Sequence, residues 1–211
     1  MNQVIPNVIL THGLWVPGLV MKPLAARLGA AGLRCHSFNY MGRARPLEAH
    51  AERLARFARA VGPAHFVGHS LGGLVILNAL AAEPGLEAGR VVLMGTPARG
   101  CLAGRRFGRH AFGRWFLGES RGLWAEGRAL RWERSEPLGV MAGTVALGLG
   151  RLFGALPGAN DGVVTVEETA VQGMTERVTL PLGHSQLIFS ARAARLVESF
   201  LKEGRFGATA R

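Results

Sequence analysis

The sequence GHSLGG at residues 68–73 places a serine in a spacing that suits covalent catalysis. Apolar residues precede and follow it, which predicts a strand over residues 64–67 and a helix over residues 71–82 that ends before Pro84. On a tight turn between the two, the hydroxyl of Ser70 would stand clear of the sheet, and the flanking glycines would avoid side-chain clashes. We therefore interpret Ser70 as the nucleophile of an acyl-transfer reaction.

A serine hydroxyl needs a base, and the chain contains seven histidines. His184 lies between a predicted strand over residues 177–180 and a predicted helix over residues 185–202 that begins at Ser185. This position is at the carboxyl end of a strand, where open α/β sheets bind their ligands. His184 is therefore the predicted base. We interpret His69 as a packing or hydrogen-bonding residue that points away from Ser70, and the following as ordinary histidines: His36, His50, His65 and His110.

The histidine in turn needs a carboxylate to hold its tautomer, and the chain has thirteen glutamates but a single aspartate, Asp161. Asp161 lies in NDGVV at residues 160–164, after the fifth predicted strand and before His184. The resulting order is Ser, Asp, His, which predicts Asp161 as the acid. Two alternatives remain: Asn-Asp-Gly also favours a plain turn, and another carboxylate could serve, namely Glu136, Glu167 or Glu168.

Attack on a carbonyl creates an oxyanion, which requires preorganised N–H donors. The backbone N–H of Leu71, the residue after the nucleophile, is one predicted donor. The second should come from the loop after the first strand, HGLW at residues 12–15, where Gly13 permits a close backbone approach. We predict the N–H of Leu14 as the second donor and Trp15 as the alternative.

The chain has 211 residues, of which 48 % are hydrophobic, so we expect a single domain over residues 1–211. Predicted strands alternate with helices, which implies right-handed crossovers and a parallel sheet covered on both faces. The predicted strands cover residues 4–10, 33–40, 64–68, 90–94, 138–142 and 177–180. The predicted helices cover residues 22–31, 46–61, 71–82 and 185–202.

The net charge is +11, and 23 of the 25 basic residues are arginines. No nucleic-acid-binding motif accompanies this charge, so we expect no nucleic-acid partner. An excess of arginine, alanine, glycine and leucine is also what a GC-rich genome produces. The first residues carry no signal-peptide pattern, which predicts a cytoplasmic protein in which Cys35 and Cys101 are free thiols.

Five of these segments together resemble the α/β-hydrolase superfamily and, within it, the bacterial lipase and esterase group. They are HGLW at 12–15, GHSLGG at 68–73, GTP at 95–97, NDGVV at 160–164 and GH at 183–184. The resemblance implies a three-layer α/β/α sandwich, a minimal α/β-hydrolase fold whose mostly parallel six-stranded sheet has the order 2-1-3-4-5-6. It also implies ester hydrolysis through an acyl-enzyme on Ser70, with a water activated by His184 and no cofactor. Some secreted relatives bind calcium through aspartates. The only aspartate of this chain, Asp161, is already assigned as the acid, so we expect no calcium site.

Residues 98–137 fall where this superfamily often inserts a cap or lid, and they carry nine arginines and six large aromatic side chains. Aromatic residues of such a cap could line an acyl pocket, and the arginines could meet an anionic lipid surface weakly. The alternative is a cap that only packs on the core. The predicted substrate-binding residues are Trp15, Trp115, Phe116 and Trp124. Acyl transfer, thioester hydrolysis and a catalytically silent anion-binding scaffold remain alternative functions. Residues 138–156 are apolar, but their glycines and Arg151 argue against a membrane span.

Overall fold

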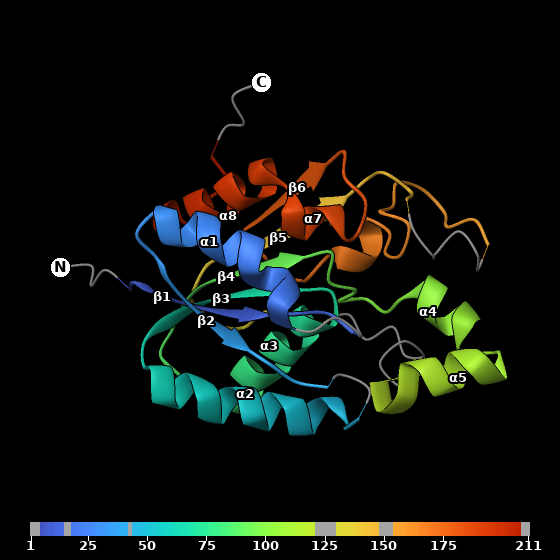
Figure 1. Ribbon diagram of the computed structural model, residues 1–211, viewed down its shortest axis with the longest axis horizontal. Coiled ribbons are helices and arrows are strands. Elements are labelled where there is room, and N and C mark those ends of the chain that lie inside the picture. Colours follow the sequence, from blue (N-terminus) through green and yellow to red (C-terminus); the bar gives the residue numbers. More distant parts are fainter. Residues whose placement is uncertain (1–4, 15–17, 42–43, 121–129, 148–153, 208–211) are drawn as a thin grey trace.

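A single sheet of six parallel strands forms the centre of the molecule (Figure 1). The computed structural model describes residues 5–14, 18–41, 44–120, 130–147 and 154–207. The strands are β1 (Asn7–Thr11), β2 (Arg34–Phe38), β3 (Ala64–His69), β4 (Ala88–Met94), β5 (Leu138–Gly143) and β6 (Glu176–Leu180). Their order, β2-β1-β3-β4-β5-β6, confirms the predicted topology, and every neighbouring pair is parallel.

Helices cover both faces of the sheet, as the sandwich prediction requires (Figure 1). The helices α1 (Lys22–Ala30), α7 (Gln186–Phe189) and α8 (Ala191–Glu203) lie on one face, and α2 (Leu47–Val61) and α3 (Leu71–Ala82) lie on the other. Each face has its own buried apolar cluster, because the central strands are covered on both sides. The remaining helices in the described ranges are α4 (Leu102–Phe107), α5 (Ala111–Leu117) and the short 3₁₀ turns η1 (Gly18–Met21), η2 (Gly118–Ser120) and η4 (Glu167–Thr169).

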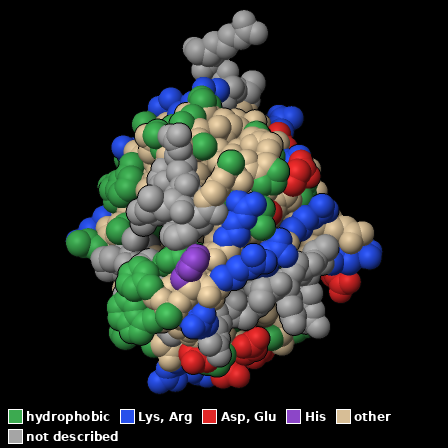
Figure 2. All heavy atoms as spheres, turned by 90° about the vertical axis from the view of Figure 1, so that its right-hand side faces the viewer, with side chains coloured by type: hydrophobic (Ala, Val, Ile, Leu, Met, Phe, Trp, Pro, Cys, Tyr) green, Lys and Arg blue, Asp and Glu red, His purple; other side chains and the backbone are tan. Residues whose placement is uncertain are grey.

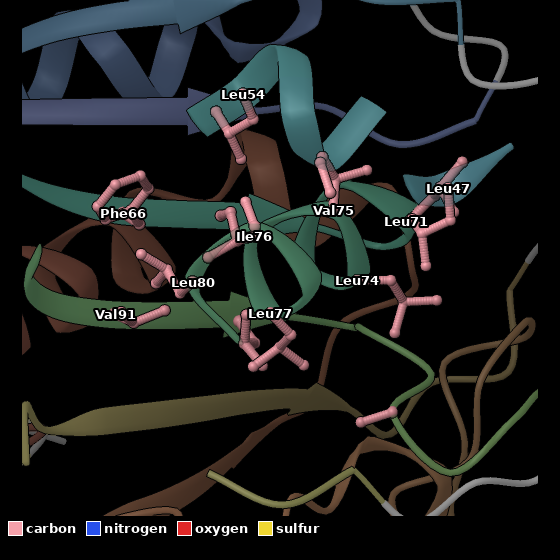
Figure 3. Close-up of a cluster of buried hydrophobic side chains, with 14 of the residues drawn as sticks. Leu47, Leu54, Phe66, Leu71, Leu74, Val75, Ile76, Leu77, Leu80 and Val91 are labelled. Carbon is pink, nitrogen blue, oxygen red and sulfur yellow. The ribbon is translucent and has the colours of Figure 1, made fainter. Parts of the chain in front are cut away.

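Helix α3 packs between the sheet and α2, which explains its almost wholly apolar sequence. Figure 3 shows Ile76 and Leu80 of α3 beside Phe66 of β3, all of them buried. A methyl group at Gly68 would lie 2.6 Å from the Cα of Gly73, so these two glycines allow β3 and α3 to approach closely. Close packing of the strand and the helix fixes the turn between them.

The predicted helix over residues 185–202 is instead two helices, α7 and α8, and Ser185, where the predicted helix begins, occupies the N-cap position of α7. Ser185 makes no side-chain capping bond, and α7 ends after Phe189. Ser190 is extended, with ψ 126°, and its hydroxyl accepts a hydrogen bond of 3.2 Å from the N–H of Ala193. Ser190 is therefore the N-cap of α8, and it reorients the chain after the loop that carries His184.

The described part of residues 98–137 begins with α4 and α5, and its end returns to the body of the protein. Trp132 is buried, and its Nε1 donates to the carbonyl oxygen of Glu136 at 2.7 Å. The guanidinium of Arg134 pairs with Glu136 at 2.6 Å and also donates to the carbonyl oxygens of Leu80, Pro84 and Leu86. Arg134 thus stabilises the end of α3 and the turn after it, and its charge is satisfied within the fold.

Both cysteines are free thiols, as predicted. The first six residues of the apolar segment after Pro137 form β5, which lies between β4 and β6 in the sheet. Within the described ranges, no helix is long and apolar enough to cross a bilayer.

Candidate active site

Ser70 alone forms the turn between β3, which ends at His69, and α3, which begins at Leu71. Its backbone has φ 54° and ψ −125°, and among the described residues it is the only one other than glycine with a positive φ. Such a conformation is strained for a side-chain-bearing residue and persists only where the surroundings enforce it. Its N–H donates to the carbonyl oxygen of Met94 in β4 at 2.9 Å, which anchors the turn to the sheet.

The loop after β1 lies directly against this turn. A methyl group at Gly13 would lie 3.1 Å from Cβ of Ser70, and one at Gly72 would lie 2.5 Å from the carbonyl oxygens of Thr11 and His12. Glycine at both positions is therefore what lets the loop and the start of α3 meet. The predicted approach of Gly13 to the serine is present.

The side chains of His184 and Asp161 form a buried pair. Nδ1 of His184 lies 2.7 Å from Oδ2 of Asp161, and the His184 backbone N–H donates to the Asp161 carbonyl oxygen at 2.9 Å. The other carboxylate oxygen, Oδ1, accepts from the N–H groups of Val163 at 2.9 Å and Val164 at 2.7 Å. A carboxylate can only accept, so Nδ1 carries the hydrogen and Nε2 of His184 is left as a proton acceptor.

The carboxyl end of β4 brings this pair to the same edge of the sheet as Ser70. A methyl group at Gly95, where φ is +58°, would lie 3.1 Å from Nδ1 of His184 and 3.2 Å from Oδ2 of Asp161. Gly95 directly follows Met94, whose carbonyl oxygen binds the Ser70 N–H. One strand end therefore contacts both the pair and the serine turn.

His69 connects the serine turn to the histidine loop. Its Nε2 donates to the carbonyl oxygen of His184 at 3.0 Å, and the two ring centroids are 4.7 Å apart. Burial, with a further contribution from the nearby His184, lowers the pKa of His69 to about 3. His69 is thus a neutral hydrogen-bonding residue, in agreement with its interpretation from the sequence.

Sequence reasoning missed the contact that holds the loop after β1. The OH of Tyr40 donates to the carbonyl oxygen of His12 at 2.7 Å, and the two rings stack at 4.5 Å. Nδ1 of His12 donates to the carbonyl oxygen of Gly13 at 2.8 Å, and its Nε2 accepts from the N–H of Tyr40 at 3.3 Å. Burial lowers the pKa of His12, which keeps the ring neutral as these bonds require. The one available signal was that Tyr40 is the sole tyrosine.

The three alternative acids are engaged elsewhere. Glu136 pairs with Arg134 at 2.6 Å, and Glu167 lies 3.7 Å from Arg177. Glu168 accepts from the N–H of Thr165 at 2.8 Å and from the N–H of Leu102 at 2.6 Å. The structure thus pairs Asp161, and none of these glutamates, with His184.

Glu168 and Cys101 connect the start of α4 to the loop that follows Asp161. Glu168 reaches the first N–H of α4, and the Cys101 thiol donates to the carbonyl oxygen of Val163 at 3.4 Å. Cys101 Sγ also accepts from the N–H of Gly104 at 3.3 Å, so it is the N-cap of α4. Burial raises the pKa of this thiol to about 12, which keeps it protonated.

Of the predicted substrate-binding residues, the structure describes the side chain of Trp115 only. Trp115 lies on α5 and is 57 % exposed. Phe116 belongs to the same helix, but its side chain lies outside the described part of the structure, as do Trp15 and Trp124. Leu14, a predicted oxyanion donor, is described, and its side chain packs against the core on the α2 and α3 side of the sheet.

A model of the alpha/beta hydrolase family matches residues 8–199. No curated protein sequence gives a significant match. Among solved structures, mature lipase BlEst2 of Bacillus licheniformis is 16 % identical, with a TM-score of 0.71, and the match covers 95 % of this chain and 92 % of that one.

The propeptide form of the same lipase has a TM-score of 0.72 and 16 % identity, over 89 % of this chain and 48 % of its own, so this chain spans about half its length. A pyrethroid hydrolase of Sphingobium faniae JZ-2 is 16 % identical with a TM-score of 0.61, over 94 % of this chain and 98 % of that one. At these identities the likeness shows the fold.

Proposed function

Because this chain belongs to the alpha/beta hydrolase family, we propose that it cleaves carboxylic esters through an acyl-enzyme formed on Ser70. The observation that carries the proposal is the 2.7 Å bond between Nδ1 of His184 and Asp161, at the strand edge where Ser70 adopts its strained turn. Acyl transfer on a serine requires an imidazole that a carboxylate holds in this way.

In the first half of the proposed reaction, Nε2 of His184 takes the proton of the Ser70 hydroxyl as Oγ attacks the ester carbonyl carbon. The imidazolium that forms is stabilised by the adjacent Asp161 carboxylate. His184 then donates the proton to the leaving alkoxide, so that an alcohol departs and the acyl group stays on Ser70. In the second half, His184 takes a proton from water as the water oxygen attacks the acyl carbon. The bond from that carbon to Oγ then breaks, His184 returns the proton to Ser70, and the carboxylic acid leaves.

Two backbone N–H groups are proposed to stabilise the oxyanion. Leu71 is the first residue of α3, so its N–H has no acceptor within the helix, and the helix dipole adds positive potential there. Leu14 follows Gly13, whose contact with Ser70 brings the loop after β1 to the same place. The bonds between Tyr40 and His12 support the loop, which suits a preorganised donor.

The acyl side of the substrate is proposed to contact four aromatic residues, Trp15, Trp115, Phe116 and Trp124. Helix α5, which carries two of them, lies beyond the carboxyl ends of the strands (Figure 1). Its apolar side chains suit an ester with an apolar acyl group.

The test is labelling of the native protein with a fluorophosphonate, together with hydrolysis of p-nitrophenyl butyrate. We expect labelling and turnover in the wild type, with loss of both in Ser70→Ala. Ser199→Ala is the matched control, since Ser199 lies on α8 away from the site. Labelling that persists in Ser70→Ala, or equal turnover by Ser70→Ala and wild type, would contradict the proposal. Product analysis with an added alcohol separates hydrolysis from acyl transfer.

A further inference from the structure

The outer face of α5 carries two exposed aromatic side chains. Phe112 is 64 % exposed and Trp115 is 57 % exposed, and their ring centroids lie 5.7 Å apart. The opposite face of the helix is turned inward, since Gly113 and Leu117 are buried. A helix face that points to solvent is normally polar, so two adjacent aromatic rings there indicate a surface that meets an apolar phase.

The segment that carries this aromatic pair is rich in basic side chains. Residues 99–118 contain five arginines and no acidic residue. Arg105, Arg109 and Arg114 are exposed, and Arg114 Nη1 donates to the carbonyl oxygen of Arg109 at 2.8 Å. Figure 2 shows the side of the molecule that carries α4 and α5, where hydrophobic side chains gather beside a histidine and a row of Lys and Arg side chains.

We propose that this surface, formed by Arg105, Arg109, Phe112, Arg114 and Trp115, docks on a bilayer that contains anionic phospholipid. Aromatic rings partition into the interfacial region of a bilayer, and arginines bind phosphate groups by paired hydrogen bonds. An exposed aromatic pair on a segment rich in arginine suits such an interface.

A second copy of the chain fits the same surface poorly. A two-fold contact through this face would bring its arginines against the arginines of the partner, and residues 99–119 hold five arginines against one carboxylate, Glu119. An anionic headgroup layer supplies the opposite charge, so charge complementarity favours the membrane.

Docking would also orient the candidate active site. Helices α4 and α5 lie beyond the carboxyl ends of the central strands, on the edge that carries Ser70 (Figure 1). The start of α4 is bonded through Glu168 to the loop that follows Asp161. A bilayer in contact with α5 therefore faces the side of the molecule where the reaction is proposed. The docking itself does not depend on ester hydrolysis.

The test is sedimentation of the protein with phosphatidylcholine vesicles, either pure or containing about one third phosphatidylglycerol. The wild type should bind the anionic vesicles tightly and the pure ones weakly, with loss at high salt. Arg105→Gln with Arg109→Gln should weaken binding to anionic vesicles about 25-fold, or about fivefold per arginine. The matched control is Arg192→Gln with Arg195→Gln, which removes the same charge from exposed positions on α8 and should bind as the wild type does.

A second pair of variants tests the aromatic contribution. Phe112→Ala should weaken binding about tenfold, whereas Phe189→Ala, which removes a 50 % exposed ring on α7, should change it less than twofold. The proposal would be overturned if both arginine double variants lost the same affinity, or if the wild type bound both vesicle types equally. It would also be overturned if the wild type were a dimer that Phe112→Ala converts to a monomer. Vesicle binding is also measured with Ser70→Ala, which should bind as the wild type does. Membrane docking is thereby tested independently of the proposed ester hydrolysis.

Discussion

Nε2 of His69 donates a hydrogen bond to the carbonyl oxygen of His184, so the residue before the serine holds the loop that presents the histidine. The two residues are 115 positions apart in the chain. The bond couples the turn after β3 to the loop after β6. The other ring nitrogen of His69, Nδ1, is near the loop after β1, since a methyl group at Gly13 would lie 3.3 Å from it.

We expect His69 to act as a positioning residue, which His69→Ala tests. Losing one buried hydrogen bond should lower kcat on a soluble ester about tenfold while KM stays unchanged, because the loop that carries His184 loses its support. His69→Gln keeps an N–H donor near the position of Nε2 and should recover most of the rate. A His69→Ala protein with a lower melting temperature but an unchanged kcat would show that the role is only structural.

Asp161→Asn should lower kcat about 10⁴-fold with little change in fold. The amide oxygen can still accept from the N–H groups of Val163 and Val164, but the amide nitrogen would face the Nδ1–H of His184, donor against donor. The imidazole would then favour the wrong tautomer.

Glu168→Gln is the matched control, because it neutralises a carboxylate in the same loop that does not contact His184. It should lower kcat by tenfold or less, through loosening of the start of α4. Steady-state rates of both variants discriminate between the carboxylates, and a larger loss in Glu168→Gln would contradict the assignment of Asp161.

Gly13→Ala should reduce kcat about 100-fold, as removal of one oxyanion donor does elsewhere. The new methyl group would lie 3.1 Å from Cβ of Ser70, so the loop that carries the Leu14 N–H must move away.

Gly29→Ala is the matched control, since open space surrounds that position in α1, and it should stabilise the protein by about 0.5 to 1 kcal/mol without a change in rate. Chemical denaturation and steady-state kinetics of both variants provide the measurement. If Gly13→Ala kept full activity, the loop after β1 would not supply a donor.

The free energy of unfolding should fall as the pH drops below about 6.5, because buried histidines cannot take up protons in the folded state. Burial lowers the pKa of His65 to about 4 and that of His69 to about 3. The unfolded chain binds protons at each site below the ordinary value of 6.5, and the folded chain does not. Each histidine should therefore remove about 1.4 kcal/mol per pH unit between 6.5 and its lowered value.

His65→Asn tests this dependence on pH. Nδ1 of His65 accepts from the N–H of Arg90 at 2.8 Å, and the amide oxygen of asparagine can accept in its place without titrating. Urea denaturation from pH 8 to pH 4.5 should give a slope that is about 1.4 kcal/mol per pH unit smaller in the variant below pH 6. Identical slopes would show that His65 takes up its proton in the folded protein.

Much of the sheet could be predicted because its signals are local. Alternating apolar runs and glycine or proline stops located all six strands within a few residues, and α3 was predicted with its observed bounds, Leu71–Ala82. The break at Ser190 could not be predicted, because no glycine or proline interrupts the helical pattern there. The side-chain cap at Ser190 depends on how the chain must turn after the His184 loop, which is a tertiary constraint.

The Ser70, Asp161 and His184 assignments came from order along the chain, and the structure brings Asp161 and His184 into contact. The residues that support them were not predictable. Tyr40 reaches His12 across two loops, and Glu168 reaches Leu102 from 66 positions away. Such contacts depend on how separate segments pack, which no local pattern records.

The positive φ of Ser70 lowers the stability of the fold at the same position where the proposed reaction needs a side chain. A serine held at φ 54° costs the folded state about 1 to 3 kcal/mol relative to an unstrained residue, and a glycine would relieve most of that cost. Selection for thermal robustness alone would thus favour removing the side chain that the proposed reaction needs. The chain keeps a serine there because the bond to Met94, the glycine contacts with Thr11 and His12, and the packed α3 together hold it in place.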